Sequence, residues 1–173
     1  MICFPKDLAA FIDICERLGY NPEILKATAR VNEQQKVFFF KKIKKALWNI
    51  SGKRIAVLGL SFKPNTDDIR LSPAIDIIKM LKKEGAKIAA FDPKAMEKAK
   101  QELSGIDYCK NAYEAIEGAD CLVLTTDWQQ FGRLDLKRVK RLLKRPIIVD
   151  GRNMFDPANM KRAGFQYSSI GRS

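Results

Sequence analysis

The sequence RIAVLGLSFKPNTDDIRLSPAIDIIKMLKKEG, residues 54–85, contains the pattern that decides the fold. It begins with RIAVLGL, residues 54–60, a short apolar run with β-branched residues that is typical of a strand buried on both faces. The later part, residues 73–85, has isoleucine and leucine at helical intervals, with a proline at its start and a glycine at its end. The stretch therefore predicts a strand, a long loop and a helix, in that order.

The same alternation continues along the rest of the chain. Further strands are predicted at 87–93, 106–109, 121–126, 146–151 and 165–170, and further helices at 95–104, 111–119, 135–144 and 157–163. This order indicates an α/β fold in which an open, Rossmann-like parallel sheet carries helices on both faces. Ligands bind such sheets at the carboxyl ends of the strands. Four loops have that position: those after Leu60, Asp92, Thr126 and Asp150.

The chain before the sheet has a different character. Residues 5–50 are expected to be helical throughout, so two regions are predicted, residues 1–50 and residues 51–173. A first helix is expected to begin at Pro5 and to end at Gly19, because proline favours the first turn of a helix and glycine favours the position after its end. The sheet domain then begins after Ser51.

A second helix is expected from about residue 22 to residue 50, because no glycine or further proline interrupts it. At 1.5 Å per residue this helix is roughly 40 Å long. Such a helix packs either in a local bundle or against a second copy of the chain. The run VFFF, residues 37–40, places apolar side chains on several faces and favours a homodimer through residues 22–50.

The chain is strongly basic, with a formal net charge of +12 over 173 residues. Most of the excess lies in residues 36–54 and 133–145. A basic surface attracts polyanions, so a nucleic acid is one candidate partner. Neither stretch interleaves aromatic residues with glycine as RNA-recognition strands do. Solvated helix faces and attraction of a small anionic ligand are therefore the favoured interpretation, with no nucleic-acid partner.

Composition excludes several other classes. No apolar run approaches the length of a membrane span, and the first residues lack the pattern of a secretory signal, which indicates a cytoplasmic protein without a membrane partner. The four cysteines show no CxxC spacing and the chain has no histidine, which argues against a zinc site and against histidine acid–base chemistry. Cys15, Cys109 and Cys121 occupy apolar positions and are interpreted as core residues.

The loop after the first strand lacks the usual dinucleotide fingerprint. A G-x-G-x-x-G sequence would supply three glycines, whereas GLSFKPNTDDIRLSP, residues 59–73, has one. Lys63 and Arg70 could hold phosphate oxygens while Phe62 stacks on a base or sugar, next to the positive N-terminus of the following helix. Alternatively, Asp67 and Asp68 pair with these two cations and the loop satisfies itself. The loop residues alone leave both interpretations open.

Motifs along the whole chain resemble those of the UDP-glucose/GDP-mannose dehydrogenase family, and in particular its UDP-glucose 6-dehydrogenase branch. They are CFPKD (3–7), VNEQQK (31–36), GLSFKPNTDDIRLSPA (59–74), FDP (91–93), GAD (118–120), TDWQQF (126–131), DGRNMFD (150–156) and IGR (170–172). The resemblance implies a catalytic-cysteine segment, a central dimerisation helix and a UDP-sugar-binding domain. Family members also have an N-terminal NAD-binding domain, which would have to act with these residues in cis or in trans.

The resemblance also implies roles for individual residues. In this family a cysteine captures an aldehyde during the two-step, NAD-dependent oxidation of UDP-glucose to UDP-glucuronate, through a thiohemiacetal and a thioester. Cys3 would be that nucleophile, and Asp7, one helical turn later, would order the water that hydrolyses the thioester. Phe62, Lys63 and Arg152 would contact the UDP-sugar. The NAD contacts would come from Cys3, Phe4, Pro5, Lys6 and Arg70.

Three hypotheses follow from the sequence. The first is an enzyme segment that is inactive without an NAD-binding domain, since the glycine-rich fingerprint is absent from these 173 residues. The second is a non-catalytic UDP-sugar-binding module, or a dehydrogenase of a related nucleotide sugar. The third is a basic nucleic-acid-binding protein, which a steep dependence of binding on salt would identify.

Overall fold

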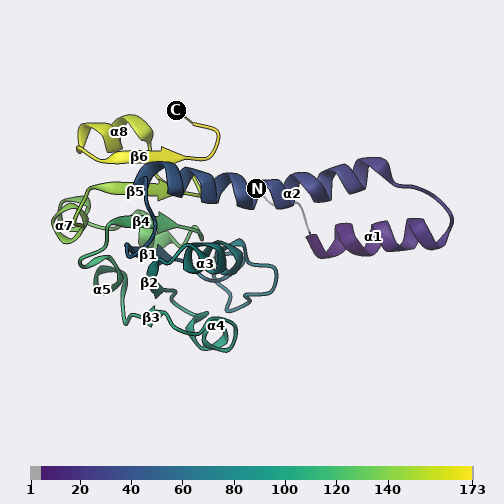
Figure 1. The fold of residues 1–173 in the computed structure, drawn as a ribbon, viewed down its shortest axis with the longest axis horizontal. Coiled ribbons are helices and arrows are strands. Elements are labelled where there is room, and N and C mark those ends of the chain that lie inside the picture. Colours follow the sequence, from purple (N-terminus) through teal and green to yellow (C-terminus); the bar gives the residue numbers. More distant parts are fainter. Residues whose placement is uncertain (1–4, 173) are drawn as a thin grey trace. The chain divides into compact units, whose positions relative to one another are not determined.

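The computed structural model describes residues 5–172. Within them the chain forms eight helices and six strands (Figure 1). The helices are α1 (Pro5–Arg17), α2 (Glu23–Leu47), α3 (Pro73–Lys83), α4 (Met96–Glu102), α5 (Ala112–Ile116), α6 (Gln129–Gly132), α7 (Leu136–Leu142) and α8 (Pro157–Arg162). The strands are β1 (Arg54–Leu58), β2 (Lys87–Phe91), β3 (Asp107–Tyr108), β4 (Cys121–Leu124), β5 (Ile147–Asp150) and β6 (Gln166–Ser169). The chain divides into two compact units, one up to Phe38 and one from Phe39 onward.

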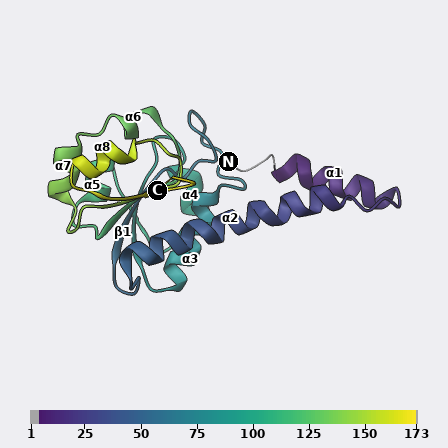
Figure 2. The ribbon, with the colours of Figure 1, turned by 90° about the horizontal axis from the view of Figure 1, so that it is seen from above.

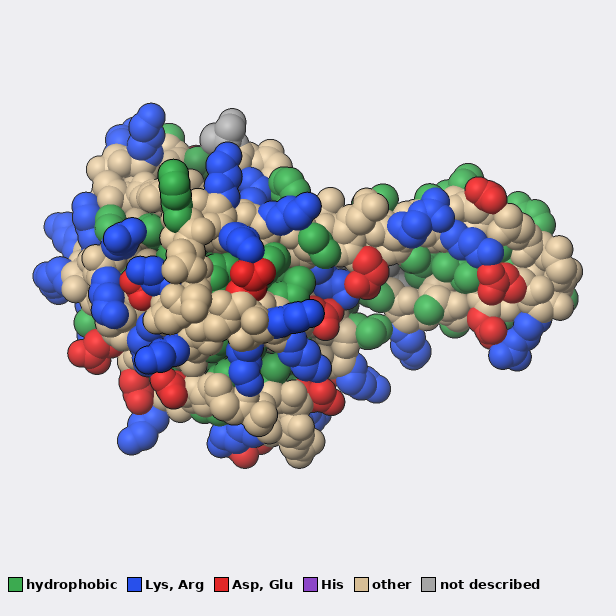
Figure 3. All heavy atoms as spheres, in the orientation of Figure 1, with side chains coloured by type: hydrophobic (Ala, Val, Ile, Leu, Met, Phe, Trp, Pro, Cys, Tyr) green, Lys and Arg blue, Asp and Glu red, His purple; other side chains and the backbone are tan. Residues whose placement is uncertain are grey.

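The first unit is a pair of helices, α1 and the first part of α2 (Figure 1). Gly19, with a φ of 77°, follows the end of α1, where its N–H donates to the carbonyl of Glu16. An ion pair of 2.6 Å between Lys26 and Glu16 joins the two helices. Figure 3 shows hydrophobic side chains between charged ones on the surface of this unit. Its exposed large apolar residues are Phe11, Ile14, Leu18, Tyr20, Ile24, Val31, Val37 and Phe38.

The second unit contains a six-stranded sheet in which every strand pair is parallel, in the order β3-β2-β1-β4-β5-β6. The chain moves outward from β1 to β3 on one side and then returns to place β4 on the other side of β1. The order therefore reverses between β1 and β4. This topology confirms the predicted Rossmann-like α/β fold, and ligands in such folds bind outside the carboxyl ends of the strands at the point of reversal.

Each face of the sheet is covered by helices, because successive strand residues point to opposite sides. Ile55 and Val57 face one core with the end of α2, α3 and α4. Ala56 and Leu58 face the other core with α5, α6, α7 and α8. Figure 2 shows α3 and α7 on opposite sides of the fold. Each fully buried aliphatic side chain stabilises such a core by roughly 1.5–3 kcal/mol.

The observed elements differ from the predicted ranges mainly at their ends. Strand β1 stops at Leu58 instead of Leu60, because Gly59 has a φ of 99° and turns the chain out of the sheet. Helix α2 ends at Leu47, before the predicted residue 50, and Trp48 follows it with a φ of 64°. The four-residue helix α6 was not predicted, because so short a segment shows no helical periodicity.

Candidate functional site

The segments after β1, β2 and β4 are fixed to one another by the buried carboxylate of Asp92. Its Oδ2 accepts the backbone N–H of Leu60 at 2.7 Å and both the N–H and the hydroxyl of Ser61 at 3.0 Å. The same oxygen accepts the indole N–H of Trp128 at 3.1 Å. Oδ1 accepts the N–H of Lys94 and Ala95. Burial alone would raise the pKa of Asp92, but the backbone donors outweigh it and hold this pKa below its usual value.

The loops after β1 and β4 are also in direct contact. The Thr126 hydroxyl donates to the carbonyl of Ser61 at 2.6 Å, and the Thr125 hydroxyl donates to the carbonyl of Gly59 at 2.5 Å. A Cβ atom on Gly59 would come within 2.6 Å of the Thr126 backbone nitrogen. Only glycine fits this close approach, so the backbone segments after β1 and β4 are held in contact where the strand order reverses.

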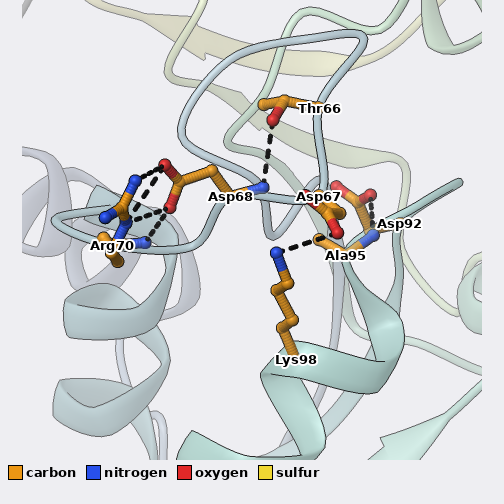
Figure 4. Close-up of polar contacts among 7 residues, drawn as sticks. All are labelled: Thr66, Asp67, Asp68, Arg70, Asp92, Ala95 and Lys98. Atoms are coloured by element: carbon orange, nitrogen blue, oxygen red, sulfur yellow. Dashed lines mark hydrogen bonds and ion pairs between the residues drawn. The ribbon is translucent and has the colours of Figure 1, made fainter.

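The loop from Ser61 to Ser72 follows directly. Its two acidic residues, Asp67 and Asp68, each pair with a different cation (Figure 4). Asp68 accepts the Arg70 guanidinium through Nε at 3.0 Å and Nη2 at 2.8 Å. This hydrogen bonding lowers the pKa of Asp68 to about 2 and raises the pKa of Arg70. Asp67 pairs with Lys98 of α4 at 2.9 Å, which lowers the pKa of Asp67.

The interpretation of a self-satisfied loop is therefore half right. Arg70 pairs with Asp68 as that interpretation expected, but its side chain stays 86% exposed. Asp67 pairs with Lys98 and not with Lys63. Lys63 is exposed, and no ion pair joins it to any residue in the described part of the chain. Phe62 is half-buried, and its N–H donates to the carbonyl of Asp68, which closes the loop.

The loop ends at Ser72, the N-terminal cap of α3. The Ser72 hydroxyl is buried, and it has no hydrogen-bond partner within residues 5–172. Pro73 occupies the first turn of the helix. A helix N-terminus carries a partial positive charge and unpaired N–H groups, so this end of the loop favours a negatively charged ligand.

Arg152 reaches the same edge of the sheet from the segment after β5. Its Nε and Nη2 contact one carboxylate oxygen of Asp127 at 2.9 and 2.8 Å, which fixes the guanidinium beside the segment after β4. The turn that carries Arg152 is held by buried Asp150, whose oxygens accept the N–H of Arg152 at 2.8 Å and of Met154 at 2.7 Å. The Tyr167 hydroxyl also donates to Asp150, and its own pKa is raised by burial and by this carboxylate.

The predicted catalytic segment belongs to the first unit. Pro5, Lys6 and Asp7 form the first turn of α1, with Lys6 and Asp7 exposed. Cys3 and Phe4 lie outside the described residues. The sheet residues Phe62, Lys63, Arg70 and Arg152 all follow the carboxyl ends of β1 and β5, which is where the sheet rule expected a ligand.

Four residues that shape the site had no predicted role: Asp92, Lys98, Asp127 and Trp128. Asp92 lies at the end of one predicted strand and Asp127 directly follows another, so their positions at the carboxyl ends of strands could have indicated a role for both. Lys98 had no such signal, because it lies in the middle of a polar helix and contacts the loop only through the tertiary fold.

Two further properties concern the described residues as a whole. No helix within 5–172 combines the length and the apolar character that crossing a bilayer requires. No group of three or more Cys, Asp or Glu side chains in this range is arranged to hold a metal ion.

Comparison with known proteins identifies the family. Residues 56–157 match the UDP-binding domain of the UDP-glucose/GDP-mannose dehydrogenase family. The chain is 42% identical over 171 residues to UDP-glucose 6-dehydrogenase TuaD of Bacillus subtilis, which covers 98% of this chain and 37% of that protein. It is 40% identical over 171 residues to UDP-glucose 6-dehydrogenase of Rhizobium meliloti, covering 98% of this chain and 39% of that protein. The chain thus spans less than half the length of either relative.

Solved structures agree with the sequence relatives. A UDP-glucose dehydrogenase from Pyrobaculum islandicum superposes with a TM-score of 0.84 at 32% identity, covering 99% of this chain and 37% of that one. A UDP-D-ManNAc dehydrogenase from Pyrococcus horikoshii superposes with a TM-score of 0.79 at 27% identity, covering 98% of this chain and 38% of that one. With the matched UDP-binding domain covering more than half of its residues, the chain belongs to the UDP-glucose/GDP-mannose dehydrogenase family.

Proposed function

We propose that residues 51–173 bind the UDP moiety of a UDP-sugar at the carboxyl edge of the sheet, and that the chain serves the NAD-dependent oxidation of UDP-glucose to UDP-glucuronate. The observation that supports this proposal is that Lys63 and Arg152 follow the carboxyl ends of β1 and β5, and that α3 begins where the β1 loop ends, all within the residues that match the UDP-binding domain of the family. Two cations and a helix N-terminus match the charge of a diphosphate.

In this proposal Arg152 and the β1 loop contact different parts of the substrate. Arg152 is held by Asp127 before a ligand arrives, so less side-chain entropy is lost on binding. Lys63 is exposed and has a flexible stem, which suits a point charge on a phosphate. Phe62, half-buried at the base of the loop, offers a ring face to the sugar or the base.

The cofactor is treated separately, because the present residues fit only part of an NAD site. Arg70, two residues before the N-cap of α3, keeps an exposed guanidinium, which suits a phosphate contact. No G-x-G-x-x-G sequence occurs in residues 1–173, so the main dinucleotide site has to come from other residues. Bound NAD accepts hydride in this chemistry. Pro5 and Lys6, with Cys3 and Phe4, are proposed to line its nicotinamide side.

The chain's own contribution to the reaction is the thiol of Cys3. The Cys3 sulfur adds to the aldehyde carbon and the carbonyl oxygen takes a proton, which forms a thiohemiacetal. Loss of hydride from that carbon and of the hydroxyl proton gives a thioester. Asp7 orders a water molecule that adds to the thioester carbonyl and releases the carboxylate and the thiol. We propose that these 173 residues produce no NADH alone, and that the family's NAD-binding domain restores turnover.

Titration calorimetry tests the binding proposal. UDP is expected to bind the wild-type chain, and Lys63→Ala and Arg152→Ala each to weaken binding by about tenfold or more. Asp127→Asn, which releases Arg152 without removing it, is expected to cause a smaller loss. Lys110→Ala removes an exposed cation outside the site and serves as the control. A wild-type chain that ignores UDP would overturn the proposal.

A second assay separates the enzyme from a pure binding module. UDP-glucose and NAD are added to the chain with and without a purified NAD-binding domain of the family. NADH formed only with both parts, and lost in Cys3→Ser, supports the enzyme. UDP binding without NADH under every condition supports the non-catalytic module. UDP-N-acetylmannosamine as a competing substrate tests the related specificity.

A further inference from the structure

A groove lies between the C-terminal part of α2 and the edge strand β6. It has a volume of about 760 Å³ and is lined by Lys41, Lys42, Lys44, Lys45, Ala46, Trp48, Gln166, Tyr167 and Ser168. Ligand pockets in proteins span roughly 300–1,000 Å³. Gln166 to Ser168 begin strand β6, whereas Lys63 and Arg152 follow the carboxyl ends of other strands. The groove is therefore distinct from the UDP edge.

One wall of the groove is a cationic stripe that ends in an aromatic ring. Lys41, Lys45 and Trp48 occur at positions i, i+4 and i+7, which places them along one side of α2. All three are exposed. The opposite side of the same segment is buried in the core through Phe39, Ile43 and Leu47. Lys44 contributes a further charge, although Glu84 pairs with it at 2.9 Å.

Trp48 is the unusual residue of this groove. It directly follows α2, has a φ of 64°, and is 92% exposed. Glycine is the usual residue at such a left-handed helix end, because a Cβ atom is disfavoured there. Tryptophan thus adopts a costly backbone conformation and exposes a large ring to water without any gain for the core. Such outliers point to a functional constraint.

The other wall supplies hydrogen-bonding groups. Strand β6 lies at the edge of the sheet, where β5 is its neighbouring strand and a single bridge joins Ser169 to Arg172. Gln166, which is exposed, and Ser168, which is half-buried, both line the groove. Each of these features suits one part of a nucleotide. The cationic stripe suits phosphates, the exposed indole suits a flat base, and the polar side chains suit the polar edge of that base.

We propose that this groove binds a nucleoside di- or triphosphate, with the base stacked on Trp48 and the phosphates on Lys41, Lys45 and Lys44. Gln166 and Ser168 contact the sugar or the base edge. An acidic peptide is less well matched, because it has no flat ring for Trp48. The groove is a regulatory candidate, since a free nucleotide can occupy it while UDP binds at the other edge.

Fluorescence and calorimetry test the proposal with ATP and UTP as probes. The chain has two tryptophans, and Trp128 is buried beside Asp92, so quenching of an exposed indole reports on Trp48. Both nucleotides are expected to quench it, and inorganic tripolyphosphate is expected to bind about tenfold more weakly, because base stacking is absent. Trp48→Gly should lose this factor without lowering Tm, because glycine suits the backbone at this position.

Charge is tested with a matched pair of variants. The double variant Lys41→Gln/Lys45→Gln is expected to weaken ATP binding by tenfold or more. Lys137→Gln/Arg141→Gln removes the same charge at the same spacing from α7 and should change binding less than twofold. Equal losses in both variants, equal binding of tripolyphosphate and ATP, or unchanged binding in Trp48→Gly would each overturn the proposal. So would binding only of poly-glutamate or of long oligonucleotides.

Discussion

The indole N–H of Trp128 donates to the carboxylate of Asp92 at 3.1 Å and thereby joins the segment after β4 to the segment after β2. The same carboxylate oxygen holds the first residues of the β1 loop, Leu60 and Ser61. One buried charge therefore organises three of the segments around the strand reversal. The proposed UDP site depends on this arrangement, although Asp92 need not touch the ligand.

Asp92→Asn tests this organising role. The Asn side chain would place an NH₂ donor against the N–H and O–H donors that now surround the carboxylate. The free energy of unfolding is therefore expected to fall by about 3 kcal/mol at pH 7. The native carboxyl has a lowered pKa, so its stabilisation is present above the unfolded value of about 3.9 and is lost as pH falls through the lower native pKa. Urea unfolding from pH 7 to pH 3 should show the difference between wild type and variant shrinking below about pH 4.

The control for that experiment is Asp107→Asn. Asp107 is an exposed partner of Arg54, and removing a surface ion pair is expected to cost less than about 1 kcal/mol. If the two variants lose the same stability, Asp92 has no special organising role.

Gly59→Ala tests the close approach between the β1 and β4 loops. The added Cβ would lie 2.5 Å from the Thr126 Cβ and would also occupy a φ of 99°. Overpacking and a left-handed backbone together are expected to lower the free energy of unfolding by about 3 kcal/mol. UDP affinity should fall as well, because the loop that carries Lys63 begins here.

Gly118→Ala serves as the control that separates backbone strain from the steric clash expected in Gly59→Ala. Gly118 also has a positive φ, of 66°, but no atom lies within 4 Å of the added Cβ. Its loss is expected to be about 1 kcal/mol, from backbone strain alone. Thermal denaturation of both variants would refute the collision argument if their Tm values fell equally.

The sheet could be predicted from sequence because its central strands, β1, β4 and β5, are buried on both faces. Each of the six strands lies inside its predicted range, since runs such as CLVL and PIIV have few other stable environments. The ends were less predictable. The turn after Leu58 depends on the contact between Gly59 and Thr126, which are far apart in sequence.

The polar contacts of the site could not be predicted from sequence for a similar reason. The loop contains two acidic and two basic residues, and the simplest prediction was that they form ion pairs with one another. In the fold, α4 brings Lys98 to Asp67, so Lys63 is left for other contacts. From sequence, Trp48 was expected to be one more residue of a long helix, and it is the structure that reveals its positive φ and its 92% exposure.

Alkylation rates test the assignment of Cys3 as the nucleophile. Burial raises the pKa of the Cys121 thiol, and burial also raises that of Cys109, so neither forms thiolate readily at neutral pH. Iodoacetamide at pH 7.5, followed by peptide mass spectrometry, is expected to modify Cys3 at least tenfold faster than these two. In denaturant the rates should converge. Faster labelling of Cys109 or Cys121 in the native chain would contradict the assignment.

Light scattering tests the homodimer that the sequence predicts through residues 22–50. Because the proposed nucleotide groove uses Lys41, Lys45 and Trp48, the dimer contact is assigned to the part of this range that precedes Lys41. Ile24 and Val31 of the first unit are 81% and 51% exposed and lie seven residues apart on α2, which is unfavourable for large aliphatic side chains unless a second copy covers them. At tens of micromolar the chain is expected to show about twice its mass of 19.7 kDa. Ile24→Glu/Val31→Glu should weaken association more than a hundredfold, because each buried side chain contributes roughly 1.5–3 kcal/mol. Gln101→Glu, an exposed polar position on α4 outside the proposed interface, is the control, and a monomeric wild type would disprove the dimer.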